Sequence, residues 1–443
     1  MNQPPGSNTN NSALARLLAK AVKIEPHEVR ATLTSFAFVF VLMAAYYILR
    51  PVRDAMASDW TDAEVSWLWT FTFFFSAIAV SLYGGAVSRV RFQRLVPSVY
   101  GFFTLSFLLF YAGTQMTSDR ELIDKAFYVW ISVFSLFHVS VFWSFMADLF
   151  SKAQAPRLFG FIGAGASTGA LAGPAIPTFF AGSIGTDNLT LIASALLVLT
   201  IPIIGVLQNL KRTDLHNESV HVTTADLEFI GGNPLSGFSD FIKNPYLLGI
   251  GLFILLYTSI GSFVYFELKN LLADYSREER SQIWASMDLV VNSLTLLIAF
   301  FVTGRMATRM GLPFTLASVP VLIMGGLVLV ATMPVVSVVV VLQIVRRAGN
   351  YAVTRPAREM LFTAVDRETR FKAKPVIDIV VYRGGDMLNA WAFTGLTTGL
   401  GLGLGAVALV GAGIAGLWAA VGIYLGRAWR DDIRTEAPTE EAP

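Results

Sequence analysis

The stretch Tyr46-Tyr-Ile-Leu-Arg-Pro-Val-Arg-Asp54 places two arginines and an aspartate at the end of an apolar run. The run is long enough to cross a membrane. A charge on such a helix costs about 2.5–3.5 kcal/mol on insertion scales, so it normally faces a cavity and has a function. Arg50 and Arg53 are three residues apart and share one helix face. Because two guanidinium groups on one face suit a carboxylate or a phosphate, the stretch predicts a membrane helix that binds an anion.

The composition places this stretch in a polytopic membrane protein. The chain has 443 residues, of which 54% are hydrophobic and 14% are charged, whereas a soluble domain has about 25% charged residues. A membrane-spanning helix needs about 20 predominantly apolar residues. Such runs predict an all-α membrane protein with twelve transmembrane helices, at residues 31–56, 66–87, 95–116, 126–150, 158–181, 187–208, 246–271, 282–304, 313–333, 335–360, 375–397 and 401–425.

The composition also excludes several classes of function. The chain has no cysteine, which excludes disulfides, thiol catalysis and cysteine metal sites. Its four histidines are scattered, so we expect no metal site and no cofactor. The glycines from Gly163 to Gly169 lie in an expected span, where small residues permit close helix packing. No Gly-x4-Gly-Lys loop is present, so an enzyme that hydrolyses nucleotide is not expected. The net charge of +2 gives no indication of a nucleic acid partner.

The positive charges predict how the helices are oriented. Of 33 lysines and arginines, twenty-one lie on one side of the expected spans and four on the other. By the positive-inside rule both termini are cytoplasmic, which suits a multi-pass protein of the inner (cytoplasmic) membrane. The remaining eight cations lie in or beside spans and require an explanation: Arg50, Arg53, Lys269, Arg346, Arg347, Arg355, Arg358 and Arg383.

The two halves of the chain resemble each other. The segment after span one aligns without a gap with the segment after span seven, so that Asp59 meets Asp274 and Trp69 meets Trp284. Two six-helix parallel repeats are the plan of major facilitator-type transporters, whose site lies between the halves. The expected divisions are a disordered N-terminus with a basic amphipathic helix (1–30), an N-terminal six-helix bundle (31–208), a cytoplasmic linker (209–245), a C-terminal six-helix bundle (246–425) and a cytoplasmic tail (426–443).

Charged and polar residues of other spans extend the candidate site of the first stretch. The residues expected to bind the substrate are Arg50, Arg53, Lys269, Arg346, Arg347 and Asn350. The residues interpreted as salt bridges or gates are Asp54, Asp148, Glu267, Asp288, Arg355, Arg358 and Glu359. For the neighbouring pairs, such as Glu267 with Lys269, a structural salt bridge remains an alternative. Asp288, alone in apolar surroundings, is either a proton site or an arginine partner.

Several segments resemble one known family. The segment from Phe142 to Gly160, and the segment that begins at Arg358-Glu-Met and continues through Asp378, resemble the ATP/ADP antiporter family of plastids and obligate intracellular bacteria. Arg50-Pro-Val-Arg-Asp54 is similar to the basic motif of the family's first span, and Glu267-Leu-Lys269 to its seventh-span pair. The resemblance implies nucleotide exchange through charged residues of spans one, four, seven and ten. Here arginine replaces lysine in the first-span motif and at Arg358 of the Arg-Glu-Met segment. The replacement keeps the positive charge but changes the geometry of the charged group.

These observations predict a secondary transporter that works by alternating access as a monomer in the lipid bilayer. Its expected substrate is a small organic anion, either a nucleotide exchanged in the ATP/ADP manner or a phosphorylated metabolite. Two alternatives stay open. One is a proton-coupled carrier of a non-nucleotide anion, in which Asp288 or Asp148 titrates. The other is a non-transporting membrane sensor or assembly factor that kept the fold.

Overall fold

The computed structural model describes residues 24–87, 90, 92–117, 119–151, 154–217, 241–298, 306, 309–365 and 376–436. The amphipathic helix expected within residues 1–30 lies almost entirely outside this part of the chain, as does most of the expected linker at 209–245.

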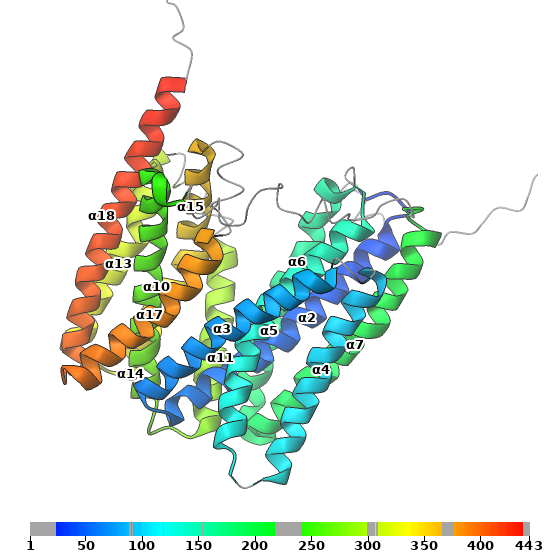
Figure 1. Ribbon diagram of the computed structural model, residues 1–443, viewed down its shortest axis with the longest axis horizontal. Coiled ribbons are helices and arrows are strands. Elements are labelled where there is room, and N and C mark those ends of the chain that lie inside the picture. Colours follow the sequence, from blue (N-terminus) through cyan, green and yellow to red (C-terminus); the bar gives the residue numbers. More distant parts are fainter. Residues whose placement is uncertain are drawn as a thin grey trace, which may run out of the picture.

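Twelve helical segments cross the molecule in the described part of the chain (Figure 1), which confirms the all-α fold class with twelve spans. Ten of them are long and apolar enough to cross a membrane by length and composition alone. The first six are α2 (Val29–Met56), α3 (Asp62–Val87), α4 (Phe92–Met116), α5 (Glu121–Leu149), α6 (Ala155–Ile184) and α7 (Thr186–Thr213). The next three are α10 (Pro245–Leu271), α11 (Arg277–Ile298) and α13 (Leu312–Thr332). The last three are α14 (Val336–Gly349) continued by η3 (Asn350–Thr354) and α15 (Arg355–Leu361), η5 (Val376–Val381) continued by α17 (Tyr382–Thr394) and η6 (Gly395–Gly399), and α18 (Leu404–Glu436).

The start of α10 has a clear sequence signal, whereas the end of α18 lies beyond the expected boundary. The side chain of Asn244 accepts hydrogen bonds from the backbone N–H groups of Tyr246 and Leu247, and Pro245 occupies the first turn of α10, as expected of a helix start. α18 continues to Glu436, well beyond the expected end of the last span at residue 425. The expected tail therefore begins as a helix that continues the last span.

Small residues allow α2 and α6 to pack closely. A Cβ atom added to Gly165 or Gly173 of α6 would lie 2.6 Å from a backbone oxygen of α2, and Gly169 between them is equally crowded. These glycines are spaced four residues apart and therefore form one face of α6. The prediction that they serve helix packing is confirmed.

Span ten changes its helical winding near its middle. α14 is followed by the π-helical turn η3 and then by α15, whose second residue is Pro356. Proline cannot donate the backbone hydrogen bond that an α-helix requires, which disfavours regular winding just before it. Such π turns often occur at functional sites. This one begins three residues after Arg347.

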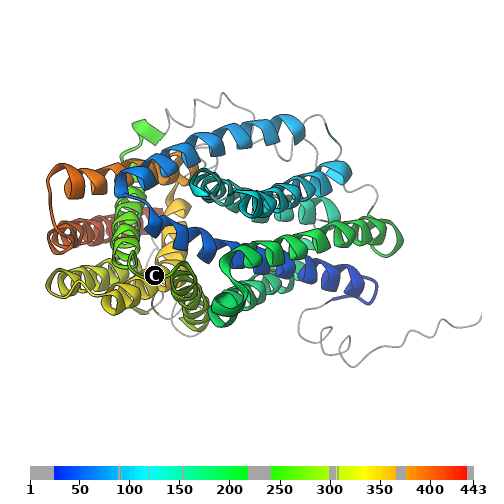
Figure 2. The same cartoon turned by 90° about the horizontal axis from the view of Figure 1, so that it is seen from below.

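The twelve segments form two bundles that meet at one end. Across the boundary between the halves, α11 packs against α6 and α2, and α17 packs against α3. Figure 1 shows the bundles diverging toward the end that holds the start of α2 and the end of α18, and Figure 2 shows α3 reaching toward α17. We call the end where the bundles meet, which carries η1 (Ala57–Asp59) and the start of α11, the closed end.

Candidate functional site

A central cavity of about 180 Å³ lies between the two halves. α2, α3 and α5 of the first half line it, and α10, α11, α14, η3 and α17 of the second half complete its walls. Five arginines contribute to the lining: Arg50, Arg53, Arg346, Arg347 and Arg383. Five cations at one small cavity inside a membrane bundle are energetically costly unless anions compensate them.

The stretch that ends α2 forms the first part of this cluster. Arg53 donates hydrogen bonds to Asp54 from Nε at 2.9 Å and from Nη2 at 2.5 Å, and its Nη1 donates to the hydroxyl of Ser132 on α5 at 3.2 Å. Arg50 lies one turn earlier, with its Nε 3.7 Å from Asp54. Asp54 is buried and thus holds both arginines on the cavity wall.

Asp288 of α11 joins the two halves at the cavity. It forms an ion pair with Arg347 of α14, and it lies 3.7 Å from Nη1 of Arg50 in the other half. All three side chains are mostly or fully buried. Of the two interpretations open from the sequence, the structure shows Asp288 as an arginine partner.

Arg346 differs from its neighbours because no carboxylate of the described residues forms an ion pair with it. Its Nε donates to Gln343 one turn earlier on the same helix, at 2.8 Å. Its guanidinium lies 5.9 Å from the ring centroid of Tyr257. Gly261 leaves room for it, since a Cβ atom there would lie 3.1 Å from Nη1. Arg346 is thus a buried cation that faces the cavity.

Several donors around the cavity also lack an acceptor within the described structure. They are Nε of Arg50, Nε and Nη1 of Arg347, and Nε1 of Trp284. A buried donor that is left unsatisfied costs about 1–3 kcal/mol. The cavity therefore has a surplus of donors, which a bound group rich in acceptor oxygens would satisfy.

The charge balance of the cavity is positive. Three carboxylates face the five arginines: Asp54, Asp288 and Asp386, the last 3.7 Å from Arg383. With all groups ionised, two positive charges remain. The cavity can therefore bind a dianion without further compensation.

Aromatic residues close the cavity toward the closed end. Nε1 of Trp69 donates to the hydroxyl of Tyr128 at 2.8 Å, and this hydroxyl lies 2.9 Å from that of Tyr265 in the other half. The rings of Trp69 and Tyr265 are 5.4 Å apart. This chain of hydrogen bonds spans the boundary between the halves and separates the arginines from the closed end.

Ion pairs between the halves lie beyond the aromatic residues. Lys269 binds Asp62 at 3.0 Å. Arg277 binds Asp124 at 2.7 Å and Asp59 at 2.6 Å. Arg280 also binds Asp59. Each of these pairs joins a cation of α10 or α11 to an acid of the first half, and together they hold the closed end shut.

The structure brings together four of the six residues expected at the substrate, namely Arg50, Arg53, Arg346 and Arg347. Lys269 lies outside the cavity, because it follows the last cavity-lining residue of α10, Tyr265, by a full turn and reaches the closed end. Asn350 lies behind the wall, where its Nδ2 donates to the hydroxyl of Tyr257 at 3.0 Å.

The residues interpreted as gates are dispersed. Asp148 pairs with Lys211 at 2.9 Å within the first half, away from the cavity. Arg355 is exposed, and Arg358 pairs with Glu359 beyond η3. The alternative pairing of Glu267 with Lys269 is wrong, because residues two apart on a helix point in nearly opposite directions. Lys269 binds Asp62 of the other half instead.

Residues that the sequence did not mark as site residues also line the cavity. Arg383 and Asp386 had a signal, since both are charges inside an expected span. The aromatic residues Trp69, Tyr257 and Tyr265 had none, because aromatic side chains make up 13% of the chain and occur in most spans.

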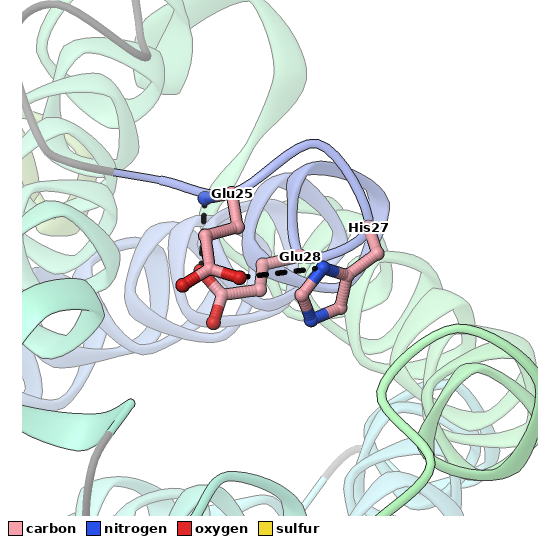
Figure 3. A group of neighbouring side chains, drawn as sticks. All are labelled: Glu25, His27 and Glu28. Carbon is pink, nitrogen blue, oxygen red and sulfur yellow. Dashed lines mark hydrogen bonds and ion pairs between the residues drawn. The ribbon is translucent and has the colours of Figure 1, made fainter.

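A group of possible metal ligands occurs at the start of α2, where Glu25, His27 and Glu28 lie close together (Figure 3). Arg157 binds both oxygens of Glu28, at 2.8 and 3.1 Å, and comes within 3.5 Å of Glu25. Burial acts to raise the pKa of Glu28, but hydrogen bonds from the Glu25 N–H and from Arg157 lower it overall. This group is thus an ion-paired helix start rather than a set of free metal ligands.

Known structures share this architecture. A bacterial homologue of the human lysosomal transporter Spinster, in an inward-facing and unoccupied conformation, matches with 14% identity and a TM-score of 0.57, over 92% of this chain and 99% of that chain. The nucleoside transporter NupG matches with 13% identity and a TM-score of 0.59, over 92% and 99%. A POT family transporter in complex with 5-aminolevulinic acid matches with 12% identity and a TM-score of 0.61, over 90% and 96%.

At such low identity these likenesses show the fold alone. No curated protein sequence matches the chain significantly. The sequence model of the Major Facilitator Superfamily, however, matches residues 35–356, which is most of the chain. The protein is therefore a membrane transporter and not an enzyme, and it belongs to the Major Facilitator Superfamily.

Proposed function

We propose that this transporter carries an organic anion with a phosphate group, either a nucleotide or a phosphorylated metabolite, across the inner membrane. The observation that carries the proposal is the surplus of positive charge and hydrogen-bond donors at the central cavity. Arg346 is buried without an ion-pair partner among the described residues, and four further donors of Arg50, Arg347 and Trp284 lack acceptors there. A phosphate group supplies two negative charges and several acceptor oxygens, and arginine forks match its geometry.

The size of the cavity indicates which part of the substrate it holds. Its volume of about 180 Å³ is smaller than the roughly 300–1,000 Å³ typical of pockets that enclose a whole ligand. The arginines therefore bind the charged group, and the rest of the substrate extends toward the end where the halves diverge. This arrangement is compatible with nucleotide exchange of the ATP/ADP type and with transport of smaller phosphate esters.

Alternating access follows from the position of the ion pairs. The contacts of Asp59, Asp62 and Asp124 hold the halves together at the closed end. By the distribution of positive charge, the closed end faces away from the cytoplasm, so the cavity is reached from the cytoplasmic side in this state. Asp288 contacts arginines of both halves. A bound phosphate would compete with it and thereby favour one arrangement of the halves over the other.

The proposal is tested by thermal-shift binding to the purified protein, followed by uptake into proteoliposomes. We expect ATP, ADP or sugar phosphates to stabilise the wild type by about 2.7 kcal/mol at a hundred times Kd. Arg346→Ala should abolish this shift, whereas Arg346→Lys should retain part of it because the charge remains. Arg355→Ala is the matched control, since Arg355 is an exposed arginine on the same span.

Each result has a distinct meaning. A shift with nucleotides that Arg346→Ala removes supports nucleotide transport, and a shift with sugar phosphates alone restricts the substrate to metabolites. Dicarboxylates that stabilise the protein while phosphate compounds do not would contradict the phosphate assignment. If no anion binds, the alternative of a sensor or assembly factor becomes the better explanation.

A further inference from the structure

Glu267 is the one buried carboxyl group of the described residues that no cation compensates. It is fully buried in α10, and neither of its carboxyl oxygens has a hydrogen-bond partner there. The other buried carboxyl groups each form an ion pair with arginine or lysine: Glu28, Asp54, Asp124, Asp148 and Asp288. An ionised carboxylate without a partner is strongly disfavoured in such an environment, and a proton normally neutralises it.

The helices packed against α10 bring no charge to Glu267. The helices with the most contacts to α10 are α14, α17 and α18, and the short segments η5, before α17, and η1, after α2, also touch it. α18 has no charged residue before Arg427, and α14 has none before Arg346, which lies beside Gly261. α17 runs alongside α10 in the same direction, because Gly385 contacts Thr258 and Phe393 contacts Phe266. The charged residues Arg383 and Asp386 of α17 therefore lie level with an earlier part of α10, away from Glu267.

The ionisable groups nearest along the chain are engaged elsewhere. Lys269 points away from Glu267 and binds Asp62. Tyr265 also lies on the opposite side of the helix and bonds Tyr128. Asp59 of η1 binds Arg277 and Arg280. Glu267 thus faces an apolar interior, which favours its neutral form in this conformation.

We propose that Glu267 is a proton-binding site that couples proton movement to transport, an inference that rests on the transport function proposed above. Glu267 lies four residues, or about 6 Å, before the end of α10. Between it and that end, Lys269 and Asn270 bind Asp62 of the other half. Opening the closed end must break these bonds and bring the end of α10 into contact with water. The O–H bond of the Glu267 carboxyl group then breaks, its proton passes to water, and the carboxylate must be protonated again before the end closes.

This assignment differs from the proton sites suggested by the sequence alone. Asp148 is bound by Lys211, and Asp288 is bound by Arg347 and Arg50. Both carboxylates are thus already paired with a cation. Glu267 has no such cation among the described residues.

The protonation state of Glu267 can be measured without any substrate. Infrared difference spectra of purified wild type and Glu267→Gln at neutral pH should show a carbonyl stretch of a protonated carboxylic acid that the variant lacks. Glu278→Gln, which replaces an acid at the start of α11 at the closed end, should leave that band unchanged. Absence of a Glu267-dependent band would overturn the proposal.

Coupling is measured in proteoliposomes loaded with a phosphate ester. A pH gradient should accelerate wild-type uptake several-fold, and Glu267→Gln should exchange substrate without responding to the gradient. A variant that still responds would show that the proton has only a structural role, which overturns the coupling. If the wild type moves no anion but the infrared band depends on Glu267, the proposed substrate class fails while the proton site stands.

Discussion

Replacing Asp59 by asparagine should loosen the closed end by a predictable amount. Asp59 is the only acid that pairs with both Arg277 and Arg280 in the described structure, so the substitution removes two ion pairs between the halves. Arg277 keeps its pair with Asp124 at 2.7 Å. Arg280 keeps its hydrogen bonds to the backbone oxygens of Leu272 and Ala273. Neither arginine is therefore left without a partner, and the loss is limited to the ion pairs themselves.

The magnitude follows from the exposure of these groups. The side chain of Asp59 is 30% exposed, and that of Arg277 is 27% exposed. Partly exposed ion pairs contribute about 0.2–1 kcal/mol each, so the loss of two should shift the equilibrium between closed and open ends by about 0.4–2 kcal/mol. Since 1.4 kcal/mol corresponds to a factor of ten, the fraction of molecules with an open end should rise roughly 2- to 30-fold.

The absence of cysteine from the chain provides the assay. Ser66 is fully buried between the halves, where its hydroxyl lies 2.8 Å from that of Thr394. A thiol introduced by Ser66→Cys reacts with a water-soluble reagent only when the closed end opens. Its labelling rate should increase by the same factor when Asp59→Asn is added. Asp119→Asn is the control, because this exposed acid near the closed end pairs with no cation of the other half within the described part of the chain.

Two results would refute this reasoning. An unchanged labelling rate in the Asp59→Asn background would show that the ion pairs of Asp59 do not hold the closed end. An equal increase with Asp119→Asn would show that any loss of negative charge at this surface has the same effect.

Three further predictions concern stability. Gly169→Leu should lower the melting temperature by several degrees, because any Cβ atom there meets the backbone of α2. Asp148→Asn should destabilise the protein by about 3 kcal/mol in denaturant or thermal unfolding, since it removes the buried carboxylate that Lys211 binds, and it should leave the substrate affinity unchanged. The pKa of Glu28 is lowered in the folded protein, so its bond to Arg157 stabilises the fold above the ordinary pKa of a glutamate and is lost as the pH falls through the lowered value. Glu28→Gln should therefore reduce the loss of stability on acidification, measured as melting temperature against pH.

The sequence predicted the elements of this protein better than the contacts between them. Runs of about twenty apolar residues identify membrane helices because the bilayer has a fixed thickness and excludes unpaired backbone groups. The match between the segments after spans one and seven correctly indicated two similar halves, and the superfamily is confirmed by the match over residues 35–356. Membership in the ATP/ADP antiporter family, the cytoplasmic termini and the monomeric state stay predictions.

The partners of the charged residues could be predicted only in part. Arg53 and Asp54 are adjacent in the sequence, so their ion pair could be predicted from the sequence alone. Asp288 pairs with Arg347, which lies 59 residues later in the chain. Asp62 pairs with Lys269 of the other half. A sequence without aligned relatives contains no information on which distant charges meet, so both pairs required the folded structure.

The sequence by itself determined that the chain crosses a membrane twelve times and that arginines lie inside the bundle, because both follow from local composition and from the high cost of charge in a membrane. Only the tertiary structure decided which cations have partners. It placed Lys269 at the closed end with Asp62, left Arg346 facing the cavity, and left Glu267 buried with no cation from the described residues beside it. The physical reason is that a helix sequence specifies the face on which a charge lies, whereas the group opposite that face depends on how the helices of two halves pack.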